Sequence, residues 1–110
     1  MSVQHRELAE GRWITLSFVE QMANIGSEVD RALNWREKNN ADYSQRALER
    51  ALELVDLTLG DRRNVSRLKE VARVREALAD FFAGDNQYGS TGPLWRKYFG
   101  AFGFAARWDR

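Results

Sequence analysis

The stretch SFVEQMANIGSEVDRALNW, residues 17–35, decides how this chain folds. Ser17 and Glu20 match a capping box, in which each side chain accepts a hydrogen bond from the other residue's backbone amide at the start of a helix. Apolar residues then recur at every third or fourth position, which is the spacing of one face of an α-helix. They are Phe18, Met22, Ile25, Val29 and Leu33. The pattern predicts a helix over 18–38.

Gly26 stands in the middle of this predicted helix, where glycine is less favourable than alanine by up to about 1 kcal/mol. It lies beside Met22, Ile25 and Val29 on the apolar face. The missing side chain would let a neighbouring helix approach closely. We therefore expect Gly26 to be a packing residue, with a large aromatic side chain of the last helix filling the space.

Polar residues border the same face, and they predict a buried polar layer because buried polar groups need hydrogen-bond partners. The candidates are Asn24, Glu28, Asp56 and Arg75. Arg75 interrupts an otherwise apolar helix face, so we expect Glu28 or Asp56 to pair with it. The alternatives are a small-ligand pocket built on these residues, or a solvated face without a role.

Three more helices follow from the apolar spacing and from their end signals. Gly60 and Gly84 are expected to end helices, and Pro93 to begin one, where its missing N–H costs nothing. Four helices with mostly short connections predict an all-α, single-domain, up-down-up-down four-helix bundle. The bundle should cover residues 17–110, after an N-terminal arm of residues 1–16. The predicted helices span 18–38, 43–59, 65–83 and 93–107.

Composition narrows the class of protein and its surroundings. Charged residues make up 30% of the chain and the formal net charge is +1, which predicts neither a strong polyanion binder nor an acidic tail. The absence of cysteine excludes disulfides, thiolate zinc sites and a cysteine nucleophile, and it favours a reducing compartment. The sequence opens without the apolar segment of a signal peptide, and no apolar run nears the roughly 20 residues of a membrane helix. We expect a cytoplasmic protein without a membrane partner.

No catalytic constellation is found in the sequence. The only histidine is His5, in the predicted arm, which argues against zinc, di-iron and Ser-His-Asp chemistry. No glycine cluster follows a predicted strand, so a phosphate-binding loop is not expected. These observations predict a non-enzymatic protein without a cofactor.

The last predicted helix, LWRKYFGAFGFAARW (94–108), is dense in aromatic residues and follows the longest loop, 84–92. One helix of a small bundle cannot bury all of these rings within the chain, and aromatic surfaces with arginine are typical of interfaces. We expect this helix to serve both the core and a protein contact, in a homo-oligomer or as a small accessory subunit. The predicted interface residues are Trp95, Tyr98, Phe99, Phe102 and Trp108.

A basic edge on the third predicted helix supports an alternative function, binding RNA or DNA through the phosphate backbone. The same charges could instead pair with neighbouring acidic residues at helical spacing on a solvated face. The residues concerned are Arg62, Arg63, Arg67, Lys69 and Arg73.

The segments EQMANIGSEVDRALNW, RALERALELVDLTL and ADFFAGDNQYGS resemble a set of small bacterial proteins without an assigned activity, over most of the chain after residue 12. In size and helix number the chain is also similar to 23S rRNA intervening-sequence proteins, to accessory proteins of diversity-generating retroelements and to HEPN domains. The nuclease-type HEPN motif, an arginine followed several residues later by a histidine, is absent. These likenesses therefore imply at most a non-catalytic bundle that binds nucleic acid or a partner.

Overall fold

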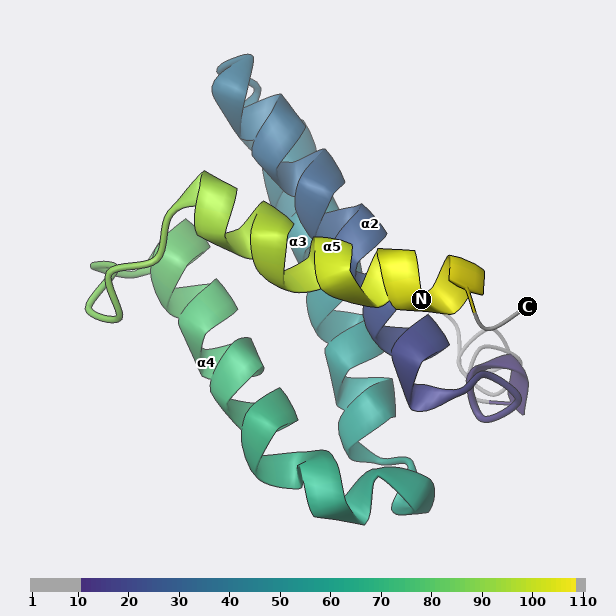
Figure 1. Cartoon of the computed structure of the whole chain (residues 1–110). Helices are drawn as coiled ribbons and strands as arrows, with labels where there is room; N and C mark the ends of the chain where they lie inside the picture. Colours follow the sequence, from purple (N-terminus) through teal and green to yellow (C-terminus); the bar gives the residue numbers. More distant parts are fainter. Residues whose placement is uncertain (1–10, 109–110) are drawn as a thin grey trace.

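The computed structural model describes residues 11–108, which form helices joined by short connections (Figure 1). No strand occurs among them, so the predicted all-α class is confirmed for this part of the chain. The first ten residues, with His5 and most of the predicted arm, lie outside the described residues. The helices are α2 (Phe18–Glu37), α3 (Ala41–Leu59), the 3-10 helix η1 (Arg62–Arg67), α4 (Leu68–Ala83) and α5 (Gly92–Trp108).

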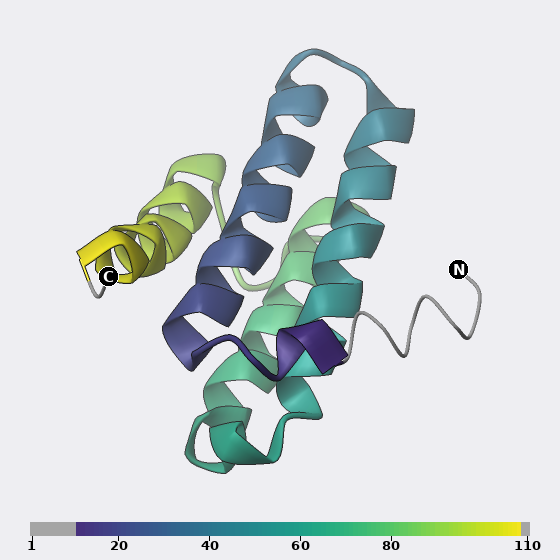
Figure 2. The same cartoon turned by 90° about the vertical axis from the view of Figure 1, so that its right-hand side faces the viewer.

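The antiparallel pair of α2 and α3 forms the centre of the fold (Figure 2). The predicted capping box begins α2: Glu20 N–H donates to Ser17 Oγ at 3.1 Å, and Ser17 N–H donates to Glu20 Oε1 at 3.0 Å. α3 begins two residues earlier than expected. Asn40 caps it, since Asn40 Oδ1 accepts the backbone N–H of Tyr43 at 3.1 Å.

The core lies between the inner faces of α2, α3, α4 and α5, and the predicted apolar face of α2 lies within it. The burial of these side chains away from water is the main favourable contribution to folding. The segment before α2 adds one further side chain, because Trp13 is buried, whereas Ile14 is exposed. The largest buried apolar residues of the α-helices are Met22, Ile25, Leu33, Leu48, Leu78, Trp95 and Phe99.

α5 lies across α2 instead of alongside it, so the expected up-down-up-down arrangement is not confirmed (Figure 1). Gly26 marks the crossing point. A Cβ atom placed on Gly26 would lie 2.6 Å from Phe99 Cβ, a distance that real side chains do not adopt. The expected packing role of Gly26 is thus confirmed, and Phe99 is the aromatic side chain that fills the space.

The connection between α3 and α4 differs from the single predicted helix over 65–83. It opens with η1, and regular α-helix starts only at Leu68. Asn64 is a residue type that favours helix caps, but its side chain is buried inside the fold. Asp61 is the cap of η1, because its Oδ1 accepts the backbone N–H of Arg63 at 3.0 Å.

Candidate functional site

The predicted polar layer is not formed as a buried unit. Asn24 and Asp56 are exposed, and the Asn24 amide donates within α2, to a backbone oxygen. Arg75 does pair with Asp56, at 2.7 Å, but this ion pair lies on the surface. Glu28 binds Arg50 at 3.1 Å instead. The prediction of a buried polar layer was wrong, because α4 packs on α3 and not on the polar side of α2.

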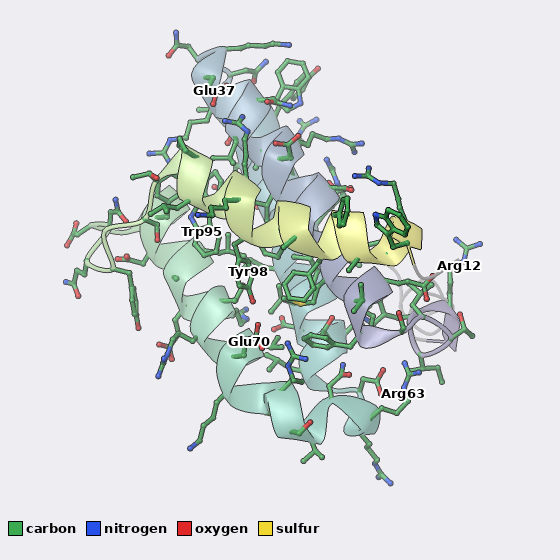
Figure 3. All side chains as sticks on the ribbon, in the orientation of Figure 1. Arg12, Glu37, Arg63, Glu70, Trp95 and Tyr98 are labelled. Atoms are coloured by element: carbon green, nitrogen blue, oxygen red, sulfur yellow. The ribbon has the colours of Figure 1, made fainter. Side chains whose placement is uncertain are left out.

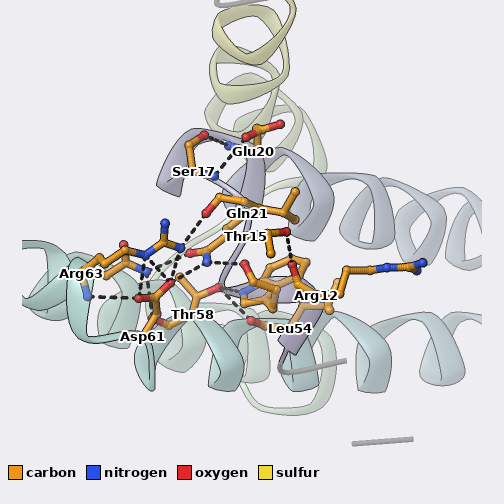
Figure 4. A network of polar contacts seen from close by, with 12 residues as sticks. Arg12, Thr15, Ser17, Glu20, Gln21, Leu54, Thr58, Asp61 and Arg63 are labelled. Carbon is orange, nitrogen blue, oxygen red and sulfur yellow. Dashed lines mark hydrogen bonds and ion pairs between the residues drawn. The ribbon is translucent and has the colours of Figure 1, made fainter. Parts of the chain in front are cut away.

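A different group of polar side chains is buried, at the end of the α2–α3 pair (Figure 4). Gln21 Nε2 donates to Asp61 Oδ2 at 2.9 Å, and Asn64 Nδ2 donates to Gln21 Oε1 at 2.8 Å. Trp13 Nε1 donates to Thr58 Oγ1 at 2.9 Å. Every one of these side chains has a hydrogen-bond partner, so the cluster is structural. It holds two parts of the chain against the core: the segment that precedes α2, and η1.

Arg63 completes this cluster from the surface. Its guanidinium donates to Asp61 Oδ2 at 2.6 Å and to the carbonyl oxygen of Leu16 at 2.7 Å. The hydrogen bonds that Arg63 and Gln21 donate to Asp61 hold the pKa of its carboxyl well below the usual range, although burial opposes the shift. Arg63, one of the predicted nucleic-acid-binding residues, therefore has a structural role.

The predicted basic edge has fewer unpaired cations than the sequence indicates. Arg67 pairs with Glu70 at 2.8 Å, and its guanidinium lies 4.3 Å from the centre of the Phe18 ring. Within the described chain, only three of the five cations make no hydrogen bond or ion pair. These exposed residues are Arg62, Lys69 and Arg73.

The predicted interface residues of α5 divide between core and surface. Trp95 and Phe99 are buried and stack on each other, with ring centres 5.9 Å apart. Tyr98 and Phe102 are half-buried, while Trp108 is 72% exposed. Trp95 and Phe99 are therefore core residues.

Sequence reasoning missed Phe104, which is 58% exposed and contacts Trp108 with ring centres 5.9 Å apart. The signal was present, because Phe104 and Trp108 are four positions apart and lie one turn from each other on the same helix face. The two rings form an exposed aromatic pair at the end of α5.

A hollow of about 410 Å³ lies between α4, the loop before α5 and the first turns of α5. Figure 3 shows Trp95 and Tyr98 reaching from α5 toward α4, where Glu70 lies opposite. The walls of the hollow are mainly apolar, and four polar side chains from α4 and the loop lie among them. The apolar part consists of Val74, Ala77, Leu94, Trp95 and Tyr98.

One hydrogen bond ties the two walls together: Tyr98 Oη donates to Glu70 Oε2 at 2.7 Å. Burial, together with this bond to Glu70, raises the pKa of the Tyr98 phenol. Burial alone would raise the pKa of Glu70, but the bonds from Tyr98 and Arg67 outweigh it and lower the pKa. Glu70 is thus an ionised acceptor at neutral pH.

The loop side of the hollow is also fixed by hydrogen bonds. The Asp80 carboxylate accepts the backbone N–H groups of Gln87 at 2.9 Å and Tyr88 at 3.0 Å. Tyr88 Oη donates to Glu76 Oε2 at 2.8 Å, and this bond raises the pKa of the Tyr88 phenol. The loop is therefore anchored to α4 at both its backbone and its side chains.

Comparisons with known proteins returned nothing: no family model, no curated protein and no solved structure matches the chain. Within residues 11–108, no three histidine, cysteine or carboxylate side chains are placed to hold a metal ion together. None of the helices formed by these residues has the length and apolar content needed to span a bilayer.

Proposed function

We propose that the protein is a non-enzymatic binding protein that acts through protein contact, and that it self-associates through α5. The observation that carries this proposal is the exposed pair of Phe104 and Trp108. A contiguous exposed apolar patch is a common mark of a protein interaction site. Aromatic side chains are also enriched among the residues that dominate binding energy at interfaces.

The rest of that helix face supports a close contact. Residues three, four, seven and eight positions apart share a face, so Gly100 lies on the same face as Gly103, Phe104, Arg107 and Trp108. A Cβ atom at either glycine would meet no atom within 4 Å, so no packing among the described residues requires glycine there. A partner's helix could approach this backbone closely. The two glycines also line a groove of about 360 Å³ between α2 and α5, which offers space for a partner's side chains.

A two-fold symmetric dimer pairs the same patch from both copies. Covering the exposed parts of Phe104 and Trp108 would contribute up to about 2 kcal/mol for each side chain. Arg107, which makes no hydrogen bond or ion pair within the described chain, lies between them on the same face. Arginine and aromatic side chains together are typical of the buried centre of protein interfaces.

Sedimentation analysis over a range of concentrations tests this proposal. The native chain should form dimers or larger species, and the Phe104→Ser, Trp108→Ser double variant should be monomeric with an unchanged helical circular dichroism spectrum. Val65→Ser is the matched control, because Val65 is an exposed apolar side chain on η1, away from α5. A native chain that remains monomeric at all concentrations would overturn self-association.

Nucleic-acid binding is the second candidate function. It is supported by the free, exposed cations Arg62, Lys69 and Arg73, although Arg63 and Arg67 are held by acidic neighbours. Binding to RNA or DNA should weaken steeply with rising salt, because each phosphate contact releases counterions. It should also be lost in the Arg62→Glu, Lys69→Glu variant. Undetectable binding at low salt would reject this candidate.

A further inference from the structure

We infer that the hollow between α4 and α5 is a binding site for a small apolar molecule that ends in a carboxylate. Its volume, about 410 Å³, lies within the range of small-molecule pockets, about 300–1,000 Å³. Ligand pockets are mostly apolar, with a few placed polar groups that orient the ligand. The hollow lies at the first turns of α5, whereas the exposed aromatic pair lies at its end, so this inference does not rest on self-association.

Trp95 provides the first observation that points to a ligand. Its side chain is only 7% exposed and lines both the hollow and the groove between α2 and α5. Its indole Nε1–H is buried and has no hydrogen-bond acceptor among the described residues. Buried polar groups are rarely left unpaired, because burial removes their bonds to water. A ligand oxygen in the hollow would supply an acceptor close to this group.

Two further donors of the hollow are also free. Arg73 lies at the hollow, and its guanidinium makes no hydrogen bond or ion pair with any described residue. The Ser90 hydroxyl group makes no hydrogen bond within the same part of the chain, although the Ser90 backbone is bonded to Asn86. The hollow therefore offers donors from α4, from the loop and from α5.

The acceptors around the hollow, in contrast, are already used. The carboxylate of Glu70 accepts from Tyr98 and Arg67, and that of Glu76 accepts from Tyr88. Asp80 is held by two backbone N–H groups of the loop. A ligand that brings acceptors therefore matches the free donors of the hollow. A carboxylate does so, and it also brings a negative charge that can form an ion pair with Arg73.

Titration with octanoate, octanol and octylammonium tests this inference, because the three probes share an apolar chain and differ only at its end. The readout is the set of indole N–H signals in ¹H–¹⁵N NMR spectra, with the Trp95 signal assigned by Trp95→Phe. Octanoate should shift the Trp95 signal saturably and bind about tenfold more tightly than octanol, because a charged acceptor strengthens the bonds. Octylammonium should not bind, since it brings only donors.

Two variants locate the site. Arg73→Gln should reduce octanoate affinity to that of octanol without changing the fold, because the Arg73 side chain is exposed. Ala77→Leu should abolish binding by filling the hollow, while Ala72→Leu, on an exposed position of the same helix, should not. The inference is overturned if no probe saturates, if octylammonium binds as well as octanoate, or if octanoate affects Trp108 and leaves Trp95 unchanged.

Discussion

Gly26 and Asp61 are the two residues at which single atoms determine how the segments of this protein fit together. At Gly26 the absence of a Cβ atom lets Phe99 rest directly on α2. At Asp61 one buried carboxylate joins the start of α2 to η1, through Gln21 and Arg63. The first role could be predicted from the sequence, because a glycine on an apolar helix face lowers helix stability unless a neighbouring segment packs closely against it. The second could not, because Gln21 and Asp61 are 40 positions apart and no local pattern links them.

Gly26→Ala should destabilise the protein by about 1–3 kcal/mol, because the added methyl group would overlap Phe99 and force it away. The gain in helix propensity, up to about 1 kcal/mol, offsets only part of this loss. Gly100→Ala is the matched control when both glycine variants are compared in the Phe104→Ser, Trp108→Ser background, which removes self-association: within one copy it has open space and should raise stability by about 0.5–1 kcal/mol. Denaturant unfolding measures both variants, and equal effects on stability would contradict the crossing at Gly26.

Asp61→Asn should lower stability at neutral pH by about 2 kcal/mol, since it removes the charge from a buried, hydrogen-bonded carboxylate. The folded pKa of Asp61 is lowered from the usual 3.8, so its contribution is present above that pH and is lost as the pH falls below it. The native chain should therefore lose stability in acid more steeply than the variant, and the difference between them should shrink.

Asp56→Asn is the control for this experiment, because its ion pair with Arg75 lies on the surface and contributes only about 0–1 kcal/mol. Unfolding curves recorded from neutral pH down to about pH 3 give the required comparison. A constant difference between the native chain and Asp61→Asn across this range would contradict a lowered pKa at Asp61.

At the scale of elements, α5 contacts two neighbours in different ways. It packs on α2 through buried rings, whereas its bond from Tyr98 to Glu70 spans the hollow to α4. The apolar spacing and end signals predicted that α2, α3 and α5 exist, within two residues at their ends. They did not predict how α5 crosses α2, because periodicity identifies the buried face of a helix but not its angle to a neighbour. η1 was missed because Asn64 matches a helix cap in sequence, while its amide instead binds Gln21 inside the fold.

Tyr98→Phe should reduce stability by about 1–2 kcal/mol, because it removes a half-buried hydrogen bond to an ionised carboxylate. Tyr88→Phe removes a similar bond, to Glu76, from an exposed ring and should change stability by less than about 0.5 kcal/mol. Thermal unfolding of the two variants provides the measurement. If Tyr88→Phe lowered stability as much as Tyr98→Phe, the Tyr98–Glu70 bond between α5 and α4 would contribute no more than an exposed hydrogen bond.

At the scale of the whole molecule, the crossing of α5 explains why aromatic residues remain uncovered. A helix lying alongside its neighbours would be covered over its full length, but one that crosses a neighbour is covered mainly near the crossing. Trp95 and Phe99 lie there and are buried, while Phe104 and Trp108, near the end of α5, remain exposed. The sequence indicated an excess of aromatic residues on this helix. Which of these aromatic residues are exposed depends on where α5 crosses α2, and this is seen only in the structure.

The central claim, that the exposed face of α5 pairs with the same face of a second copy, is tested most directly by disulfide cross-linking. The chain has no cysteine, so a single introduced thiol reports only its own surroundings. Under mild oxidation at low protein concentration, Gly100→Cys should form a covalent dimer rapidly, whereas Ser66→Cys, exposed on η1, should not. Equal and slow cross-linking of the two variants would contradict the pairing of α5 with α5.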